Sequence, residues 1–121
     1  MKRLCRAAAF LICTAFIQGV STTAAQNAAR TIEIHAKRFS FSPSEITIKK
    51  GETVKLVVTS EDVTHSLVIP DLRVNAEAKV DHPAEITITP DKVGDFRGKC
   101  GHFCGTGHAS MKFVAHVTSD H

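Results

Sequence analysis

Residues 100–111 read CGHFCGTGHASM, and this short stretch determines how the rest of the chain is interpreted. It brings together two thiols, Cys100 and Cys104, the imidazole of His108 and the thioether of Met111. The glycines between these residues supply the backbone freedom that a tight reversal of the chain requires. Segments with alternating apolar residues precede and follow the stretch, so we expect a ligand-rich loop between two β-strands.

Period-two alternation of apolar residues continues outward from this loop, over most of the chain from Thr31 onward. The short apolar runs are separated by turns of Gly, Pro and charged residues, a pattern typical of an antiparallel β-sandwich. They lie at residues 32–34, 39–41, 46–48, 54–58, 63–69, 86–88 and 113–117. We therefore predict an all-β sandwich. Residues 71–83 fit this pattern poorly, and residues 75–79 indicate either a helical turn or an excursion between sheets.

The first 25 residues have the features of a secretory signal peptide. Lys2, Arg3 and Arg6 form a basic start, and the apolar run at residues 7–17 is short for a membrane span. Small residues at 23–25 offer a cleavage site. We predict a signal peptide at residues 1–25, with an uncleaved N-terminal anchor as the alternative. A single domain at residues 26–121 should then lie in the periplasm or outside the cell, without a membrane span.

The excess of basic residues resides in the predicted signal peptide. The whole chain has 15 Lys and Arg residues against 12 Asp and Glu residues. Three of the basic residues and none of the acidic ones lie within residues 1–25. The remaining chain is close to neutral, which gives no electrostatic case for nucleic-acid binding.

Only two of the four cysteines, Cys100 and Cys104, lie beyond the predicted signal peptide. In an oxidising compartment such a pair forms a disulfide or holds a metal. A disulfide leaves His108 and Met111 unexplained, and zinc leaves Met111 and the upstream His65 unexplained, although both alternatives stay open. Sulfur donors combined with imidazole favour copper over calcium or magnesium.

The number of thiolates bears on how many copper ions the site would hold. One copper ion in a blue-copper site uses two imidazoles, one thiolate and a weak axial thioether. The loop therefore has one thiolate too many, and two ions that share both thiolates would accommodate the excess. His65 can supply the second imidazole, because it shares one face of a strand-like run with Leu67 and Ile69. Surface positions without a ligand role are expected for His35, His82, His116 and His121.

The chain resembles the CuA domain of cytochrome c oxidase subunit II, a cupredoxin, from about residue 41 to residue 111. The resemblance rests on Phe-Ser-Pro at 41–43, Asp-Val-Thr-His-Ser at 62–66 and the Cys-x3-Cys-Gly-x2-His-x2-Met spacing of the loop. It implies a cupredoxin-like Greek-key β-sandwich. It also implies a binuclear CuA-type centre with two copper ions that exchanges single electrons.

The resemblance further implies six metal ligands: His65, Cys100, the backbone carbonyl of His102, Cys104, His108 and Met111. The two thiolates would bridge both ions. His65 and Met111 would complete one ion, and His108 with the His102 carbonyl would complete the other. No catalytic residue is expected, because protein groups would fill every metal position and leave none for a substrate.

Three functions remain open. The first is an electron carrier that serves a c-type cytochrome or a respiratory enzyme. The second is a periplasmic copper chaperone or storage protein, against which the complete ligand set argues. The third is a module that docks on a terminal oxidase and receives its electrons. Against this third function, His102 stands where such oxidase subunits usually carry a magnesium-binding glutamate, and the chain has no tryptophan for an exposed aromatic cluster.

Overall fold

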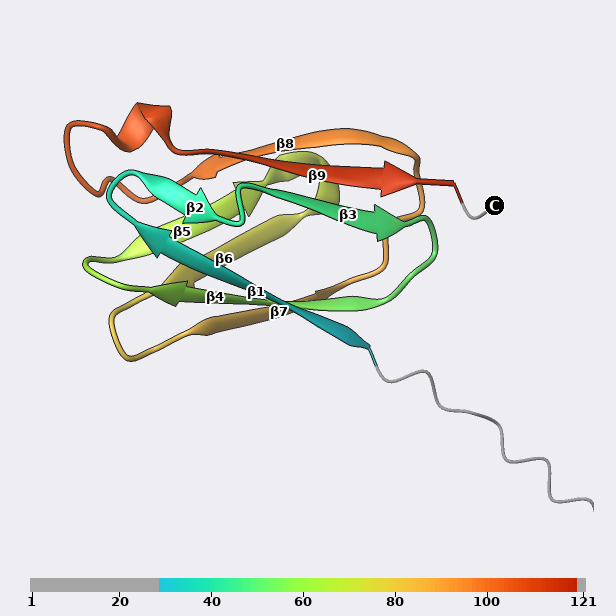
Figure 1. Cartoon of the computed structure of the whole chain (residues 1–121), viewed down its shortest axis with the longest axis horizontal. Helices are drawn as coiled ribbons and strands as arrows, with labels where there is room; N and C mark the ends of the chain where they lie inside the picture. The colour runs from blue at the N-terminus through green and yellow to red at the C-terminus, as the bar shows by residue number, and fades with distance from the viewer. Residues whose placement is uncertain (1–28, 120–121) are drawn as a thin grey trace, which may run out of the picture.

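The computed structural model describes residues 29–119, which fold into two β-sheets packed face to face (Figure 1). The predicted signal peptide at residues 1–25 lies outside the described residues. Between residues 29 and 119 the strands are β1 (Arg30–Lys37), β2 (Ser40–Ser42), β3 (Glu45–Lys49), β4 (Val54–Ser60), β5 (His65–Ile69), β6 (Val74–Ala78), β7 (Ala84–Ile88), β8 (Gly94–Cys100) and β9 (Lys112–Thr118). Two single-turn 3-10 helices accompany them, η1 (Pro70–Leu72) and η2 (His108–Ser110). No helix among these residues has the length and apolar character that crossing a bilayer requires.

The order of strands is β2-β1-β4-β7 in one sheet and β3-β9-β8-β5-β6 in the other. The predicted β-sandwich is confirmed, but the prediction that it is antiparallel is wrong for two pairs. Strands β1 and β4 pair in parallel, and so do β3 and β9. The reason is that β3 crosses into the second sheet, so that β4 returns to the first sheet in the same direction as β1 (Figure 1).

Residues 74–78 form strand β6, so the helical turn considered for residues 75–79 is wrong. Val74, Ala76 and Ala78 are buried, whereas Asn75 and Glu77 are exposed. The alternation has period two, but the alanines make it weak as an apolar signal. The chain does pass between the sheets at this point, because β6 pairs with β5 and β7 pairs with β4.

The core lies between the two sheets and is built from their inward-facing aliphatic and aromatic side chains. Ile34 and Leu56 of the first sheet and Leu67 of the second are fully buried. The rings of Phe41 and Phe113 meet edge to face across the interior, with centroids 5.9 Å apart. Such a contact contributes about 0.5–1.5 kcal/mol beyond its burial of surface. The sandwich is thus a packed shell that can fix loops at its ends.

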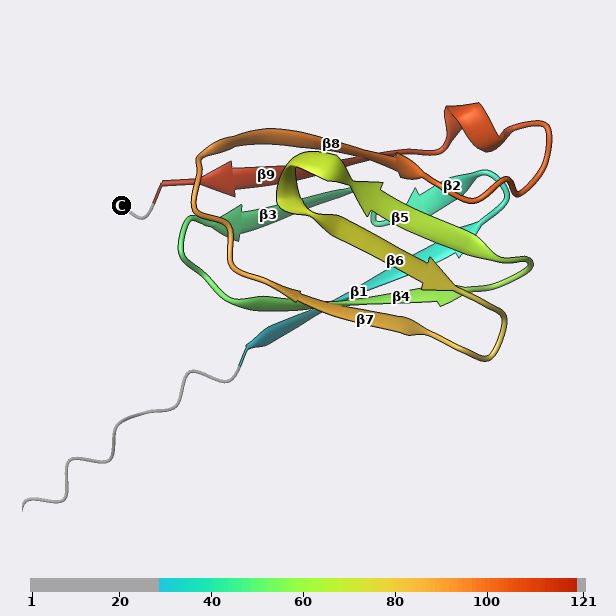
Figure 2. The ribbon, with the colours of Figure 1, turned by 180° about the vertical axis from the view of Figure 1, so that it is seen from behind.

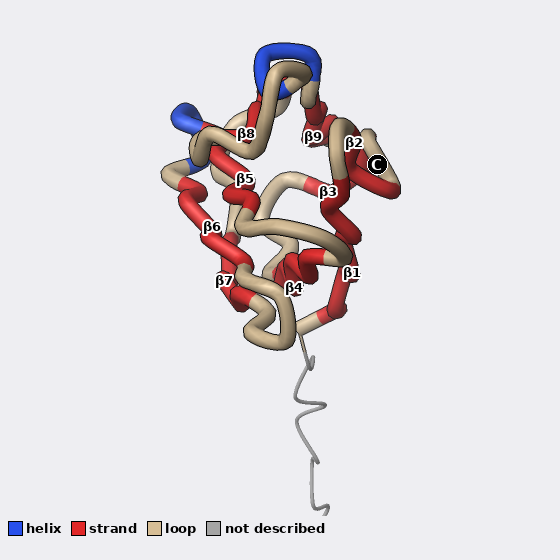
Figure 3. The backbone as a smooth tube through the Cα atoms, turned by 90° about the vertical axis from the view of Figure 1, so that its left-hand side faces the viewer, coloured by secondary structure: helices blue, strands red, loops and turns tan. Residues whose placement is uncertain are grey.

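Three of the connections at one end of the sandwich, opposite the end where β1 begins and β9 finishes, contact one another (Figures 1 and 2). They are the β1–β2 turn, the β4–β5 loop and the long β8–β9 loop with η2. Figure 3 looks onto this end, where the β8–β9 loop forms an arch beside the other two connections. Residues more than sixty positions apart in sequence are therefore neighbours here, as for Arg38 and Cys104, which are 66 positions apart.

The outer face of the second sheet carries a histidine with two acidic partners. His116 on β9 has Nδ1 2.6 Å from Oδ1 of Asp95 on β8 and Nε2 3.3 Å from Oε2 of Glu45 on β3. The hydrogen bond with Asp95, supported by that with Glu45, raises the pKa of His116. His116 thus joins three adjacent strands of the second sheet.

Replacement of Asp95 by Asn should lower the pKa of His116 toward the ordinary value of about 6.5. Because the folded-state pKa is raised, the stabilising effect of the pair is complete below that ordinary value. It is lost as the pH rises through the raised folded-state pKa. Titration of the His116 ring protons by NMR measures the shift, and urea unfolding on both sides of neutral pH measures the loss. Asp91→Asn, at an exposed site in the connection between β7 and β8, is the control, and an unchanged His116 pKa in Asp95→Asn would contradict the assignment.

Candidate metal centre

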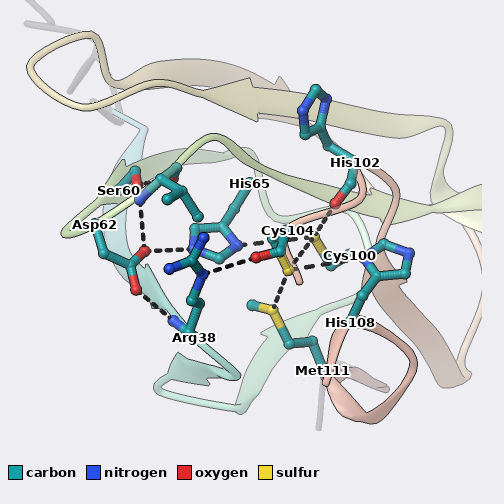
Figure 4. A network of polar contacts seen from close by, with 10 residues as sticks. Arg38, Ser60, Asp62, His65, Cys100, His102, Cys104, His108 and Met111 are labelled. Atoms are coloured by element: carbon teal, nitrogen blue, oxygen red, sulfur yellow. Dashed lines mark hydrogen bonds and ion pairs between the residues drawn. The ribbon is translucent and has the colours of Figure 1, made fainter. Parts of the chain in front are cut away.

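His65 is the first residue of β5, is fully buried, and has partners on both ring nitrogens. Its Nε2 lies 2.7 Å from Oδ1 of Asp62, and its Nδ1 lies 3.9 Å from Sγ of Cys100 (Figure 4). Donation of the Nε2 hydrogen to the carboxylate leaves the lone pair of Nδ1 directed at the thiol. This is the arrangement of a histidine that is prepared to ligate a metal through Nδ1.

Asp62 is held in place by three donors. Its Oδ1 accepts from His65 and from the backbone N–H of Val63 at 2.7 Å, and its Oδ2 accepts from the backbone N–H of Arg38 at 2.7 Å. Burial opposes ionisation of this carboxyl, but the hydrogen bonds from Arg38, His65 and Val63 prevail and lower the pKa of Asp62. The ionised carboxylate therefore fixes both the ring orientation and the tautomer of His65.

Cys100 is the last residue of β8, and Cys104 follows it in the β8–β9 loop. Both thiols are buried, and neither forms a disulfide. Their sulfur atoms are 3.9 Å apart, far beyond the disulfide bond length of about 2.05 Å. Two sulfurs at this separation can both lie within a metal–thiolate distance of about 2.3 Å of one point between them. The pair can therefore hold metal jointly.

The remaining predicted ligands surround this sulfur pair. The Cys100 thiol contacts the carbonyl oxygen of His102 at 3.1 Å. The Cys104 sulfur lies 3.8 Å from Nδ1 of His108 and 3.4 Å from Sδ of Met111, which is buried. All six predicted ligand groups are thus brought to one place (Figure 4), where those of His65 and His102 contact Cys100 and those of His108 and Met111 contact Cys104.

The loop that carries the ligands is packed tightly against two other connections. A Cβ atom on Gly101 would lie 2.5 Å from Cγ2 of Val68, and one on Gly107 would lie 2.4 Å from the ring of Phe39. The N–H of Gly101 also donates to the Ser66 hydroxyl at 3.1 Å. Only glycine permits such an approach, so these contacts fix the loop on β5 and on the β1–β2 turn.

Burial raises the pKa of the Cys104 thiol, and the neighbouring Cys100 raises it further. Without metal, Cys104 is therefore a thiol at neutral pH. A thiol must lose its proton to become a metal ligand, so metal binding here releases protons.

The donor set fits copper. One nitrogen of His65 and the sulfurs of Cys100 and Cys104 all lie within 4.8 Å of one another, and all three residues are buried. Sulfur and imidazole donors in a buried site select copper, zinc or iron over the hard cations calcium and magnesium. The adjacent thioether of Met111 favours copper among these, because thioether sulfur is a soft donor that suits copper.

Three residues that support the site received no individual role from the sequence: Arg38, Asp62 and Ser66. Asp62 and Ser66 were visible as parts of the Asp-Val-Thr-His-Ser motif, but the motif alone does not reveal which group each contacts. Arg38 donates from Nε to the carbonyl of Cys104 at 2.8 Å. No local pattern signals that contact, because it depends on how the sandwich brings the two loops together.

Comparison with known proteins supports this description. The sequence matches the family model for the cupredoxin-like domain over residues 8–114. A probable cytochrome c oxidase subunit 2 of Streptomyces coelicolor is 38% identical over 72 residues, 60% of this chain and 23% of the relative. A nitrous-oxide reductase of Cupriavidus necator is 36% identical over 86 residues, 68% of this chain and 13% of the relative. The chain thus spans less than a quarter of the length of these relatives.

The fold is shared with a solved structure. The crystal structure of the periplasmic domain of subunit II of cytochrome oxidase from Bradyrhizobium japonicum has a TM-score of 0.69 to this chain, at 21% identity. The likeness covers 75% of this chain and 85% of that domain. The predicted fold class is therefore confirmed.

Replacement of Asp62 by Ala should weaken copper binding by roughly 10- to 100-fold, because His65 loses the partner that orients it. Competition with a chromophoric copper chelator measures the affinity. Asp71→Ala, at an exposed position of η1, is the matched control. If Asp62→Ala and Asp71→Ala retained copper equally well, the orienting role of Asp62 would be refuted.

Proposed function

Because the chain belongs to the cupredoxin-like domain family, we propose that it binds two copper ions in a CuA-type centre and transfers single electrons. The observation that carries this proposal is the buried pair of sulfur atoms 3.9 Å apart, with a histidine Nδ1 close to each. The six proposed ligands are those predicted from the sequence: His65, Cys100, the His102 carbonyl, Cys104, His108 and Met111.

Copper, when bound, would supply the one-electron chemistry, with the electron shared between two ions so that each metal–ligand distance changes little. The contribution of the chain is rigidity and exclusion of water. Asp62 fixes the His65 ring, the Gly101 N–H fixes the loop on Ser66, and the sulfurs are buried. A site whose ligands are already in place has little to rearrange when its charge changes, which favours fast electron transfer.

We place the protein outside the cytoplasm and assign it a redox protein, such as a c-type cytochrome or a respiratory enzyme, as partner. The predicted signal peptide supports the location, and so does the likeness to a domain described as periplasmic. Phe103, with 73% of its surface exposed, lies beside His108, with ring centroids 5.7 Å apart. This aromatic group gives a partner an apolar contact next to a proposed ligand.

A docked module of a terminal oxidase is the second candidate, because relatives of this chain are oxidase subunits. The side chain of His102 does not favour it. An imidazole stands at position 102 in place of the magnesium-binding glutamate, and its Nδ1 lies 3.5 Å from Oε2 of Glu77 on the molecular surface. A copper chaperone is less consistent with a site in which His65, both cysteines and Met111 are buried. Rapid release of copper to an apo-enzyme would reverse that ranking.

Reconstitution of the reduced protein with copper, followed by electron paramagnetic resonance, tests the proposal. We expect two copper ions per chain and hyperfine coupling to two equivalent copper nuclei. Cys100→Ser should abolish this signal and leave at most a mononuclear one, because a single thiolate cannot bridge in the same way. A signal from one copper nucleus in the wild-type protein under every loading condition would contradict the proposal.

Met111→Leu should retain copper and shift the reduction potential, because an axial thioether tunes a copper site more than it anchors the metal. Leucine preserves the buried volume at this position, which limits the cost to folding. Copper content and a spectroelectrochemical titration measure the two effects. Complete loss of copper from Met111→Leu would show that the thioether is a principal ligand.

A further inference from the structure

Arg38, in the turn between β1 and β2, contacts both halves of the candidate metal centre although it supplies no metal ligand. Its backbone N–H donates to Oδ2 of Asp62, the residue that orients His65. Its side-chain Nε–H donates to the backbone carbonyl of Cys104 at 2.8 Å (Figure 4). One residue thus joins the β4–β5 loop, which carries Asp62, to the β8–β9 loop, which carries Cys104.

The guanidinium of Arg38 also places a positive charge beside the site. Among residues 29–119, no carboxylate forms an ion pair with it. Asp62 accepts from its backbone N–H. The guanidinium group of arginine is a planar, delocalised cation. It is held next to the peptide of Cys104, which is one of the two proposed bridging residues.

We propose that Arg38 is a positioning residue that holds the β4–β5 loop and the β8–β9 loop of the metal centre together. We also propose that its charge raises the reduction potential of that centre. The second part rests on the proposed function, because only a copper-loaded site has such a potential. Uptake of one electron makes the site more negative by one charge, and a nearby cation favours that state. Arg38 lies at the surface, where water and salt weaken its field.

Three variants separate the charge of Arg38 from its hydrogen bond. Arg38→Gln removes the charge and keeps a side-chain N–H donor. Arg38→Lys keeps the charge and loses the planar guanidinium group with its fixed N–H donors. Arg38→Met removes both and keeps an unbranched side chain. The backbone contact with Asp62 is available in all three. Arg73→Gln, beyond the end of β5 that is remote from His65, removes the same charge and is the matched control.

Spectroelectrochemical titration of the copper-loaded proteins tests the charge. We expect Arg38→Gln and Arg38→Met to shift the equilibrium toward the oxidised state by up to about tenfold, or about 59 mV for one electron. Arg38→Lys should stay close to the wild-type protein, and Arg73→Gln should match it. Equal potentials in Arg38→Gln and Arg73→Gln, or equal shifts in Arg38→Gln and Arg38→Lys, would overturn the electrostatic part of the proposal.

Alkylation of Cys104 in the reduced, metal-free full-length chain tests the positioning role of Arg38 without copper. Site-resolved mass spectrometry should show that Cys104 reacts several-fold faster in Arg38→Met than in Arg38→Gln, which removes the same charge but keeps a side-chain donor, and than in Arg73→Gln. Equal alkylation rates in these three proteins would overturn the positioning role of Arg38. If the wild-type protein held only one copper ion, the proposed function would fail, while the alkylation rates would still decide the positioning role of Arg38.

Discussion

The close approach of two buried thiols, with sulfurs 3.9 Å apart, is the constraint on which the rest of the structure depends. Burial and mutual repulsion make it costly to ionise both sulfurs without a cation between them. The surrounding groups are therefore arranged for metal: two histidine nitrogens, one carbonyl oxygen and one thioether contact the pair. A soft cation would neutralise the sulfurs and satisfy these donors together.

The sandwich makes this arrangement possible by fixing three connections at one end of a packed shell. Strand β8 delivers Cys100, β5 delivers His65, and the β1–β2 turn supplies the surface on which the ligand loop rests. Each connection is tied to another by a contact that a mobile loop would lack. Examples are the Gly107–Phe39 approach and the Gly101–Ser66 hydrogen bond. Rigid support of this kind keeps a metal site in one geometry, which is the structural requirement for an electron-transfer protein.

The sequence predicts the β-sandwich and the loop residues that meet at the candidate site because both leave local signals: period-two alternation and a fixed spacing from Cys100 to Met111. It does not predict the parallel pairing of β1 with β4, which follows from a crossover between sheets. Strand β6 is missed because two of its three buried residues are alanines. The role of Arg38 is missed for a different reason. Its contact with Cys104 spans 66 positions and exists only in the folded molecule.

The central claim is that Cys100 and Cys104 hold two copper ions between them. X-ray absorption at the copper edge of the fully loaded protein tests it most directly, because this measurement reports the atoms around each copper whatever the oxidation state. We expect sulfur and nitrogen neighbours together with a second copper at short distance. Sulfur neighbours without any copper neighbour, at a stoichiometry of one ion per chain, would contradict it.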